Sequence, residues 1–186
     1  LPYLDGVSIS FFDSKATEFL EFQQKRLDFI NDIDASFKDE ILTKTGNIKK
    51  EWEGKLVLQK HPYLNIEYLG ILVDSNNVLV KKSPLRWQKI RQAINYGFDR
   101  KKLMLYLRNS IGTAANSGFI PLGMPSFDSA VVKGYHYDPD KARKLLLEAG
   151  FSGGNNLPTI KLLTIPIYAD LAGYISNELN LIGIPI

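Results

Sequence analysis

Side chains that could carry out catalysis or bind a metal are few in this chain. It contains two histidines, His61 and His136, and no cysteine, so thiolate nucleophiles, thiolate metal sites and disulfides are excluded. Neither histidine stands in a metal-ligand spacing such as H-E-x-x-H, and no G-x-S-x-G turn or phosphate-binding glycine loop occurs. We interpret both histidines as turn or packing residues. The sequence therefore predicts a protein that is not an enzyme, has no catalytic residues and needs no cofactor.

An acidic cluster between positions 28 and 40 is a candidate calcium site. Its members are Asp28, Asp32, Asp34, Asp39 and Glu40. An EF-hand loop that started at Asp32 would need glycine where Phe37 stands and glutamate where Thr43 stands. The cluster is better explained as the solvated entry of a helix, and we predict no metal site.

The composition is that of an ordinary globular domain. The chain has 186 residues, of which 45% are hydrophobic and 23% charged, and its formal net charge is +3. This balance argues against disorder and against nucleic-acid binding, and no apolar run approaches the roughly 18 residues that span a bilayer. The chain starts at Leu1 without an initiator methionine and stops on apolar residues 184–186. We therefore interpret both ends as cut inside a larger structure.

In the first half of the chain, short apolar runs alternate with weak helical patterns. We expect one helix to follow the turn at residues 13–15, and a second to bury a stripe of Phe37, Ile41 and Leu42. A turn or an edge is expected at Pro62, because proline cannot donate to a central ladder. The expected strands cover residues 7–12, 27–30, 56–59 and 66–73.

Helical signals are stronger in the second half. Behind Pro84, apolar or small residues fall at i, i+3, i+4 and i+7, which predicts an amphipathic helix. Further helices are expected after the N-caps Asp99 and Asp138 and over residues 169–182. The other expected elements are a long loop at residues 112–129, a turn at 152–156, and strands at 159–164 and 184–186.

Strands that alternate with helices predict an α/β fold with a mixed sheet flanked by helices. The chain shows no internal repeat and no linker. With this length, residues 1–186 are interpreted as a single domain.

Two motifs carry a resemblance to a known family. Residues 84–100, PLRWQKIRQAINYGFDR, follow the pattern P-x-x-x-x-x-[VI]-R-Q-A-[IL]-N-Y-[AG]-[FIL]-D-R, and residues 135–151, YHYDPDKARKLLLEAGF, contain Y-D-P-x-K-A-x-x-L-L-x-E-A-G-[FY]. In this order and at this distance, the motifs resemble those of the family 5 extracellular solute-binding proteins, the oligopeptide-, dipeptide- and nickel-binding components of ABC importers. The resemblance extends over almost the whole chain, although family members are usually much longer.

The resemblance implies a fold and a biological setting. The chain would be a C-terminal lobe fragment similar to lobe II of a type II (cluster C) periplasmic binding protein, whose two lobes close over a ligand by a hinge. The implied ligand is a small peptide or similar solute, and the implied partner of the full-length protein is an ABC permease in the inner membrane. A monomer, in the periplasm or cell envelope and with a lipid anchor on the full-length precursor, would fit this role.

A second interpretation remains open. Some transcription regulators carry a similar pair of lobes as a ligand-sensing domain behind a DNA-binding domain. A helix-turn-helix elsewhere in the full-length sequence would identify such a regulator, whereas a signal peptide with a lipid-attachment cysteine would identify a solute-binding protein.

The resemblance also indicates ligand contacts in residues 62–70. This segment resembles the strand from which oligopeptide binders offer tyrosines and an acidic residue, and Tyr63 and Tyr68 match its aromatic positions, with Asn65 between them. A tyrosine offers apolar area and a hydroxyl, which suits a peptide backbone. Gly70 stands at the acidic position, so a contact to a cationic ligand group is not inherited. The alternative is that these are ordinary sheet tyrosines.

A second set of implied contacts lies in the loop of residues 164–170. The candidates there are Thr164, Tyr168 and Asp170. Dipeptide binders place an arginine in this loop to hold the ligand carboxylate, and Ile165 takes that position here. The motif residues, in contrast, are expected to support the lobe rather than touch the ligand: Arg91, Gln92 and Asp99.

Overall fold

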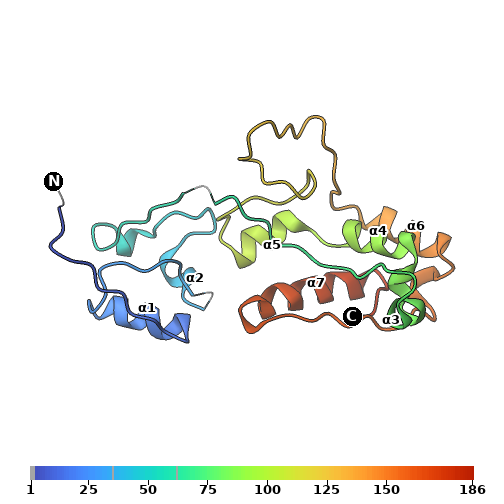
Figure 1. Cartoon of the computed structure of the whole chain (residues 1–186), viewed down its shortest axis with the longest axis horizontal. Coiled ribbons are helices and arrows are strands. Elements are labelled where there is room, and N and C mark those ends of the chain that lie inside the picture. Colours follow the sequence, from blue (N-terminus) through green and yellow to red (C-terminus); the bar gives the residue numbers. More distant parts are fainter. Residues whose placement is uncertain (1–2, 35, 62) are drawn as a thin grey trace. The chain divides into compact units, whose positions relative to one another are not determined.

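The computed structural model describes residues 3–34, 36–61 and 63–186 (Figure 1). The chain groups into two compact units, Leu1–Leu58 and Gln59–Ile186. Each unit has its own cluster of buried apolar residues. The single domain expected from the sequence stays a prediction, and the units are described one by one.

Unit 1 is built around one buried aromatic side chain. Its elements are the helices α1 (Lys15–Gln23) and α2 (Lys38–Ile41) and the 3₁₀-helix η1 (Lys50–Trp52). Ser14 caps α1 by accepting a hydrogen bond from the Thr17 backbone N–H, as its residue type favours. The ring of Phe19 on α1 is 1% exposed and lies 4.7 Å from the ring of Phe37, centroid to centroid. Both helices expected in this half are confirmed, although α2 is a single turn.

Unit 2 is mostly helical. Its elements are α3 (Val78–Lys82), η2 (Pro84–Arg86), α4 (Gln88–Gly97), α5 (Arg100–Leu107), α6 (Pro139–Glu148), η3 (Ser152–Gly154), η4 (Pro166–Tyr168) and α7 (Ala169–Leu181). The helices expected from the sequence are confirmed, and α3 is a short helix that the sequence did not predict. The long loop expected from residue 112 is also confirmed, since no helix lies between α5 and α6.

The core of unit 2 follows the predicted helical spacing. On α4 the buried residues are Ile90, Ala93, Ile94 and Gly97. A Cβ atom at Gly97 would lie 2.6 Å from the Ile182 side chain and 2.7 Å from that of Leu179. Glycine therefore lets the end of α4 approach α7 closely.

The N-caps of α5 and α6 are those predicted from the sequence. Asp99 accepts hydrogen bonds from the backbone N–H groups of Lys101 and Lys102, and Asp138 accepts one from that of Lys141. Each cap satisfies donors that have no partner inside the helix. The ends of both helices are thus fixed by local chemistry.

The mixed sheet is not confirmed. Over the described residues no strand is assigned, and the segments expected as strands are extended or irregular chain. An isolated antiparallel bridge joins Leu42 to Ile48, and one backbone hydrogen bond of 2.9 Å runs from Ile160 to Pro185. A strand needs a neighbour to pair its backbone groups, and alternating apolar residues do not supply one. The turn expected at Pro62 lies outside the described residues.

Candidate functional site

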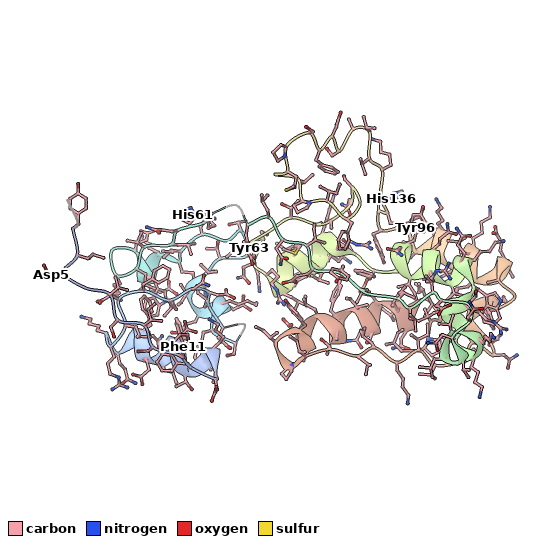
Figure 2. All side chains as sticks on the ribbon, viewed as in Figure 1. Asp5, Phe11, His61, Tyr63, Tyr96 and His136 are labelled. Atoms are coloured by element: carbon pink, nitrogen blue, oxygen red, sulfur yellow. The ribbon has the colours of Figure 1, made fainter. Side chains whose placement is uncertain are left out.

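The two candidate tyrosines of segment 63–70 are both open to solvent. The side chain of Tyr63 (Figure 2) is 85% exposed and that of Tyr68 is 67% exposed. Asn65 is exposed as well, and its backbone N–H donates to the Tyr63 carbonyl at 2.8 Å. An exposed phenol can offer its ring and its hydroxyl to a ligand at the same time.

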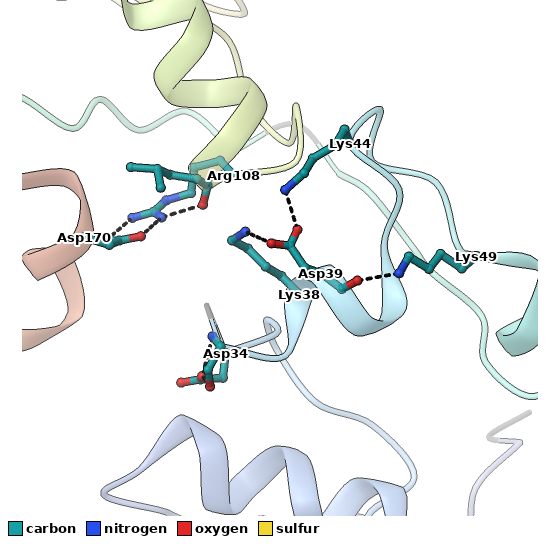
Figure 3. Close-up of polar contacts among 9 residues, drawn as sticks. Asp34, Lys38, Asp39, Lys44, Lys49, Arg108 and Asp170 are labelled. Atoms are coloured by element: carbon teal, nitrogen blue, oxygen red, sulfur yellow. Dashed lines mark hydrogen bonds and ion pairs between the residues drawn. The ribbon is translucent and has the colours of Figure 1, made fainter. Parts of the chain in front are cut away.

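Asp170 is held by an ion pair rather than left free for a ligand. It follows η4 at the start of α7, and its carboxylate accepts two hydrogen bonds from Arg108, at 2.8 Å and 3.4 Å (Figure 3). It also accepts the backbone N–H of Leu171 at 2.8 Å. Partial burial raises the pKa of Asp170, but the hydrogen bonds and charge of Arg108 outweigh this effect and leave the pKa below its usual value.

Sequence reasoning missed Arg108. It is the C-cap of α5 and stands 62 residues before its partner. Its Nη1 also donates to the Leu107 carbonyl at 2.7 Å, which satisfies one of the last carbonyls of the helix. No motif or helical spacing links it to Asp170, so no local signal could have found the pair.

Tyr168 lies among charged and phenolic groups of the same unit. The negative charge of Glu67 raises the pKa of the Tyr168 hydroxyl most, followed by partial burial and by a hydrogen-bonding interaction with that carboxylate. Arg108 lowers this pKa, and Tyr63 raises it slightly. Tyr63, Tyr168 and Asp170, which the sequence named separately, thus form one neighbourhood. We call these three with Glu67 and Arg108 the polar cluster.

The remaining candidates contact residues outside the polar cluster. Tyr68 packs its ring edge against Phe119, with centroids 4.9 Å apart and planes at 66°. Successive side chains of an extended segment point to opposite faces, which separates Tyr68 from its neighbour Glu67. The Thr164 hydroxyl donates to the adjacent Ile165 carbonyl at 3.3 Å. Tyr68 and Thr164 therefore have partners other than the members of the polar cluster.

Two of the motif residues make bonds within the helical framework. Arg91 donates from Nη1 to the carbonyls of Leu85 and Arg86, at 2.7 Å and 3.0 Å, and so fastens η2 to α4. Asp99 caps α5, as described above. These bonds fit the predicted supporting role for Arg91 and Asp99.

The two groups considered first for metal chemistry have packing or charge partners. The His136 ring lies 5.7 Å from the ring of Tyr96, edge to face (both labelled in Figure 2). In unit 1, Asp39 pairs with Lys38 at 3.1 Å and Lys44 at 2.8 Å (Figure 3). In the part of the chain that the structure describes, no three His, Cys, Asp or Glu side chains are arranged to hold a metal ion.

Comparison with known proteins identifies the family. All residues, 1–186, match the family described as bacterial extracellular solute-binding proteins, family 5 Middle. The chain belongs to this family, as its two motifs indicated. Among the described residues, no helix is long and apolar enough to cross a membrane.

Curated relatives share about a third of their residues with the matched part of the chain. The oligopeptide-binding protein OppA of Lactococcus lactis subsp. lactis (strain IL1403) is 32% identical over 144 residues, which cover 74% of this chain and 22% of the relative. Heme-binding protein A of Haemophilus influenzae is 31% identical over 106 residues, covering 57% and 18%, and the dipeptide-binding protein of Escherichia coli K12 is 36% identical over 97 residues, covering 52% and 16%. The chain spans about a fifth of the length of these relatives.

Solved structures share the fold. NikZ of Campylobacter jejuni, in complex with Ni(L-His), superposes with a TM-score of 0.61 at 22% identity, over 98% of this chain and 36% of that one. MoaA of A. tumefaciens R10, in complex with mannopinic acid, gives 0.61 at 23% identity, over 94% and 32%. The fold is therefore that of these periplasmic binding proteins.

Proposed function

We propose that this chain is the lobe II portion of the substrate-binding component of an ABC importer that takes up oligopeptides or dipeptides. Support comes from the family and from relatives named for oligopeptide and dipeptide binding. In the complete protein, two lobes close over the ligand by a hinge and the closed form delivers it to a membrane permease. A lipid anchor in the cell envelope belongs to the same proposal.

The polar cluster is the structural feature that supports this proposal. It combines two phenols, Tyr63 and Tyr168, with the carboxylate of Glu67 and the Arg108–Asp170 pair. Phenol hydroxyls can donate to peptide carbonyls and accept from peptide N–H groups, and their rings can cover apolar side chains. Such a mixture suits a ligand that repeats amide groups along an apolar chain.

Binding of defined peptides to the complete gene product that contains this chain tests the proposal. Calorimetry with di-, tri- and pentapeptides should show micromolar or tighter binding by at least one length. The matched variants are Tyr63→Ala and Tyr168→Ala, each expected to weaken binding about 5- to 150-fold, the range for losing an aromatic contact worth 1–3 kcal/mol. Val57→Ala, at an 87% exposed position of unit 1, is the control and should bind as the unaltered protein does. Absence of binding at every peptide length would contradict peptide uptake.

A further inference from the structure

The loop between α5 and α6, which projects at the top of Figure 1, is closed at its base. The Gly134 backbone N–H donates to the Asn116 carbonyl at 3.1 Å. A Cβ atom at Gly134 would lie 2.6 Å from that carbonyl oxygen and 2.7 Å from the backbone nitrogen of Gly118. Glycine at position 134 lets the two ends of the loop come this close, so residues 116–134 form a loop with a narrow neck.

The first part of this loop packs on the segment that carries the candidate tyrosines. Phe119 meets Tyr68 edge to face, as described above, and a Cβ atom at Gly123 would lie 2.8 Å from the Leu64 side chain. Both rings stay largely open, since Phe119 is 63% and Tyr68 is 67% exposed. Two partly exposed rings fixed against each other offer apolar area without the entropy cost of ordering free side chains.

Gly70 lies beside the Tyr68 ring and, as a glycine, places no charged side chain there. A Cβ atom at Gly70 would meet only the Tyr68 ring, at 3.9 Å, which is ordinary van der Waals contact. Its φ is not in the left-handed region. A larger side chain is thus compatible with the backbone at this position, and it would extend from beside the Tyr68 ring.

From this geometry we infer that Tyr68, Gly70 and Phe119 form a subsite for an apolar or aromatic side chain of the bound peptide, and that Phe119 determines its specificity. The inference rests on the proposed function, and it adds the class of peptide side chain that the site would prefer. Phe119 fixes the Tyr68 ring and adds a second apolar face. Gly70 supplies no carboxylate that would favour lysine or arginine.

Peptide selectivity of the complete gene product tests this subsite. The probes are trialanine peptides with a single phenylalanine or a single lysine at each of the three positions. The ratio of lysine-peptide Kd to phenylalanine-peptide Kd should be about 10 at one position, which corresponds to an aromatic contact of roughly 1.4 kcal/mol. Phe119→Ala should bring that ratio close to 1, and Gly70→Glu should bring it below 1 by adding a carboxylate beside the ring.

Matched variants separate the subsite from effects on folding. Phe119→Leu keeps apolar bulk but loses the ring contact, so it should lose most of the selectivity with little change in melting temperature. Gly134→Ala should also lower the selectivity ratio, because the added Cβ would force the neck of the loop to open and would move Phe119 away from Tyr68. Val131→Ala, at a 76% exposed position of the same loop, should leave the ratio unchanged.

The possible results distinguish this inference from the proposed function. If the peptides bind without preference, or if the preference survives both Phe119→Ala and Gly70→Glu, the subsite is wrong while peptide binding stands. An equal loss of preference in Val131→Ala would also overturn the specific role of Phe119. If none of the six peptides binds, peptide binding itself is wrong and the subsite is overturned with it.

Discussion

At the scale of single residues, the Arg108–Asp170 pair shows how a candidate ligand contact becomes a structural one. The carboxylate is committed to two hydrogen bonds from the guanidinium and one from the Leu171 N–H. A ligand would have to displace Arg108 before it could use Asp170. We therefore expect Asp170 to contribute mainly by holding the start of α7, while Tyr63 and Tyr168 remain available to a ligand.

Replacing Asp170 by asparagine should lower stability in a pH-dependent way. The folded-state pKa of Asp170 is depressed, so the pair stabilises the fold above the unfolded-state pKa of about 3.9, and this contribution is lost as pH falls through the folded-state value. We expect a loss of about 1 kcal/mol at neutral pH, since the pair is partly exposed. Denaturant unfolding at pH 7 and at roughly pH 3 measures it.

The control for that measurement is Asp140→Asn. Asp140 also pairs with an arginine, Arg143, at 2.9 Å, but its side chain is 93% exposed. Exposed pairs contribute little, so the change should be small at both pH values. Equal losses in the two variants would contradict a special role for the Arg108–Asp170 pair.

Neutralising Glu67 should lower the pKa of the Tyr168 hydroxyl. The negative charge of Glu67 disfavours the phenolate and is the largest cause of the raised pKa. In Glu67→Gln, Tyr168 should therefore ionise at lower pH than in the unaltered chain. An NMR pH titration of tyrosine-labelled protein, with Tyr168→Phe to assign the signal, measures this. An unchanged or raised pKa would show that the two groups do not interact in solution.

At the scale of elements, burial and capping explain the helices, whereas the extended segments lack partners. The segment 7–12 alternates as a strand should, yet Val7, Ile9 and Phe11 are 76%, 73% and 92% exposed (Phe11 is labelled in Figure 2). Apolar residues on alternate positions favour a buried face, and within the described residues no ladder provides one. The sequence pattern thus predicts that a segment can form a strand, but whether it pairs into a sheet depends on the segment that lies beside it.

Substituting Gly97 by alanine should destabilise unit 2. The added Cβ would meet the Ile182 and Leu179 side chains at 2.6 Å and 2.7 Å, and overpacking of this kind costs about 1–3 kcal/mol. The gain in helix propensity, up to about 1 kcal/mol, offsets only part of it. Gly173→Ala in α7 is the matched control, because a Cβ there meets nothing within 4 Å. Thermal unfolding should place Gly97→Ala below the unaltered chain and Gly173→Ala at or above it; the reverse order would refute the close approach.

At the scale of the whole molecule, this chain accounts for only part of a solute-binding protein. It spans 22% of the length of the Lactococcus relative and 36% of that of NikZ. A ligand is held tightly when most of its surface is buried in a concave site. We propose that the exposed tyrosines described above form one side of such a site and that the second lobe forms the other.

The 186-residue chain by itself should therefore bind peptides weakly or not at all. Half of a two-lobe cleft buries too little of the ligand to offset the cost of association. Calorimetry of the chain against the peptides that bind the complete gene product is the measurement, with circular dichroism to show that the chain is folded. Micromolar or tighter binding by the folded chain alone would contradict the two-lobe account.

The sequence by itself determined the family, the helices of unit 2 other than the short α3, and the core that these helices share. These follow from local rules: Asp99 and Asp138 are suited to cap helices, and Ile90, Ala93, Ile94 and Gly97 repeat at helical spacing. The candidate tyrosines, in contrast, were proposed from the resemblance of one short segment to the family, and not from these local rules.

Only the tertiary structure decided which of the candidates lie together. Arg108 reaches Asp170 across 62 residues, and Phe119 reaches Tyr68 through the folding of a long loop. No periodicity or motif in the sequence reveals either contact, because each depends on how distant elements pack and not on local propensity. For the same reason alternating apolar residues could not tell whether a segment would find a strand to pair with.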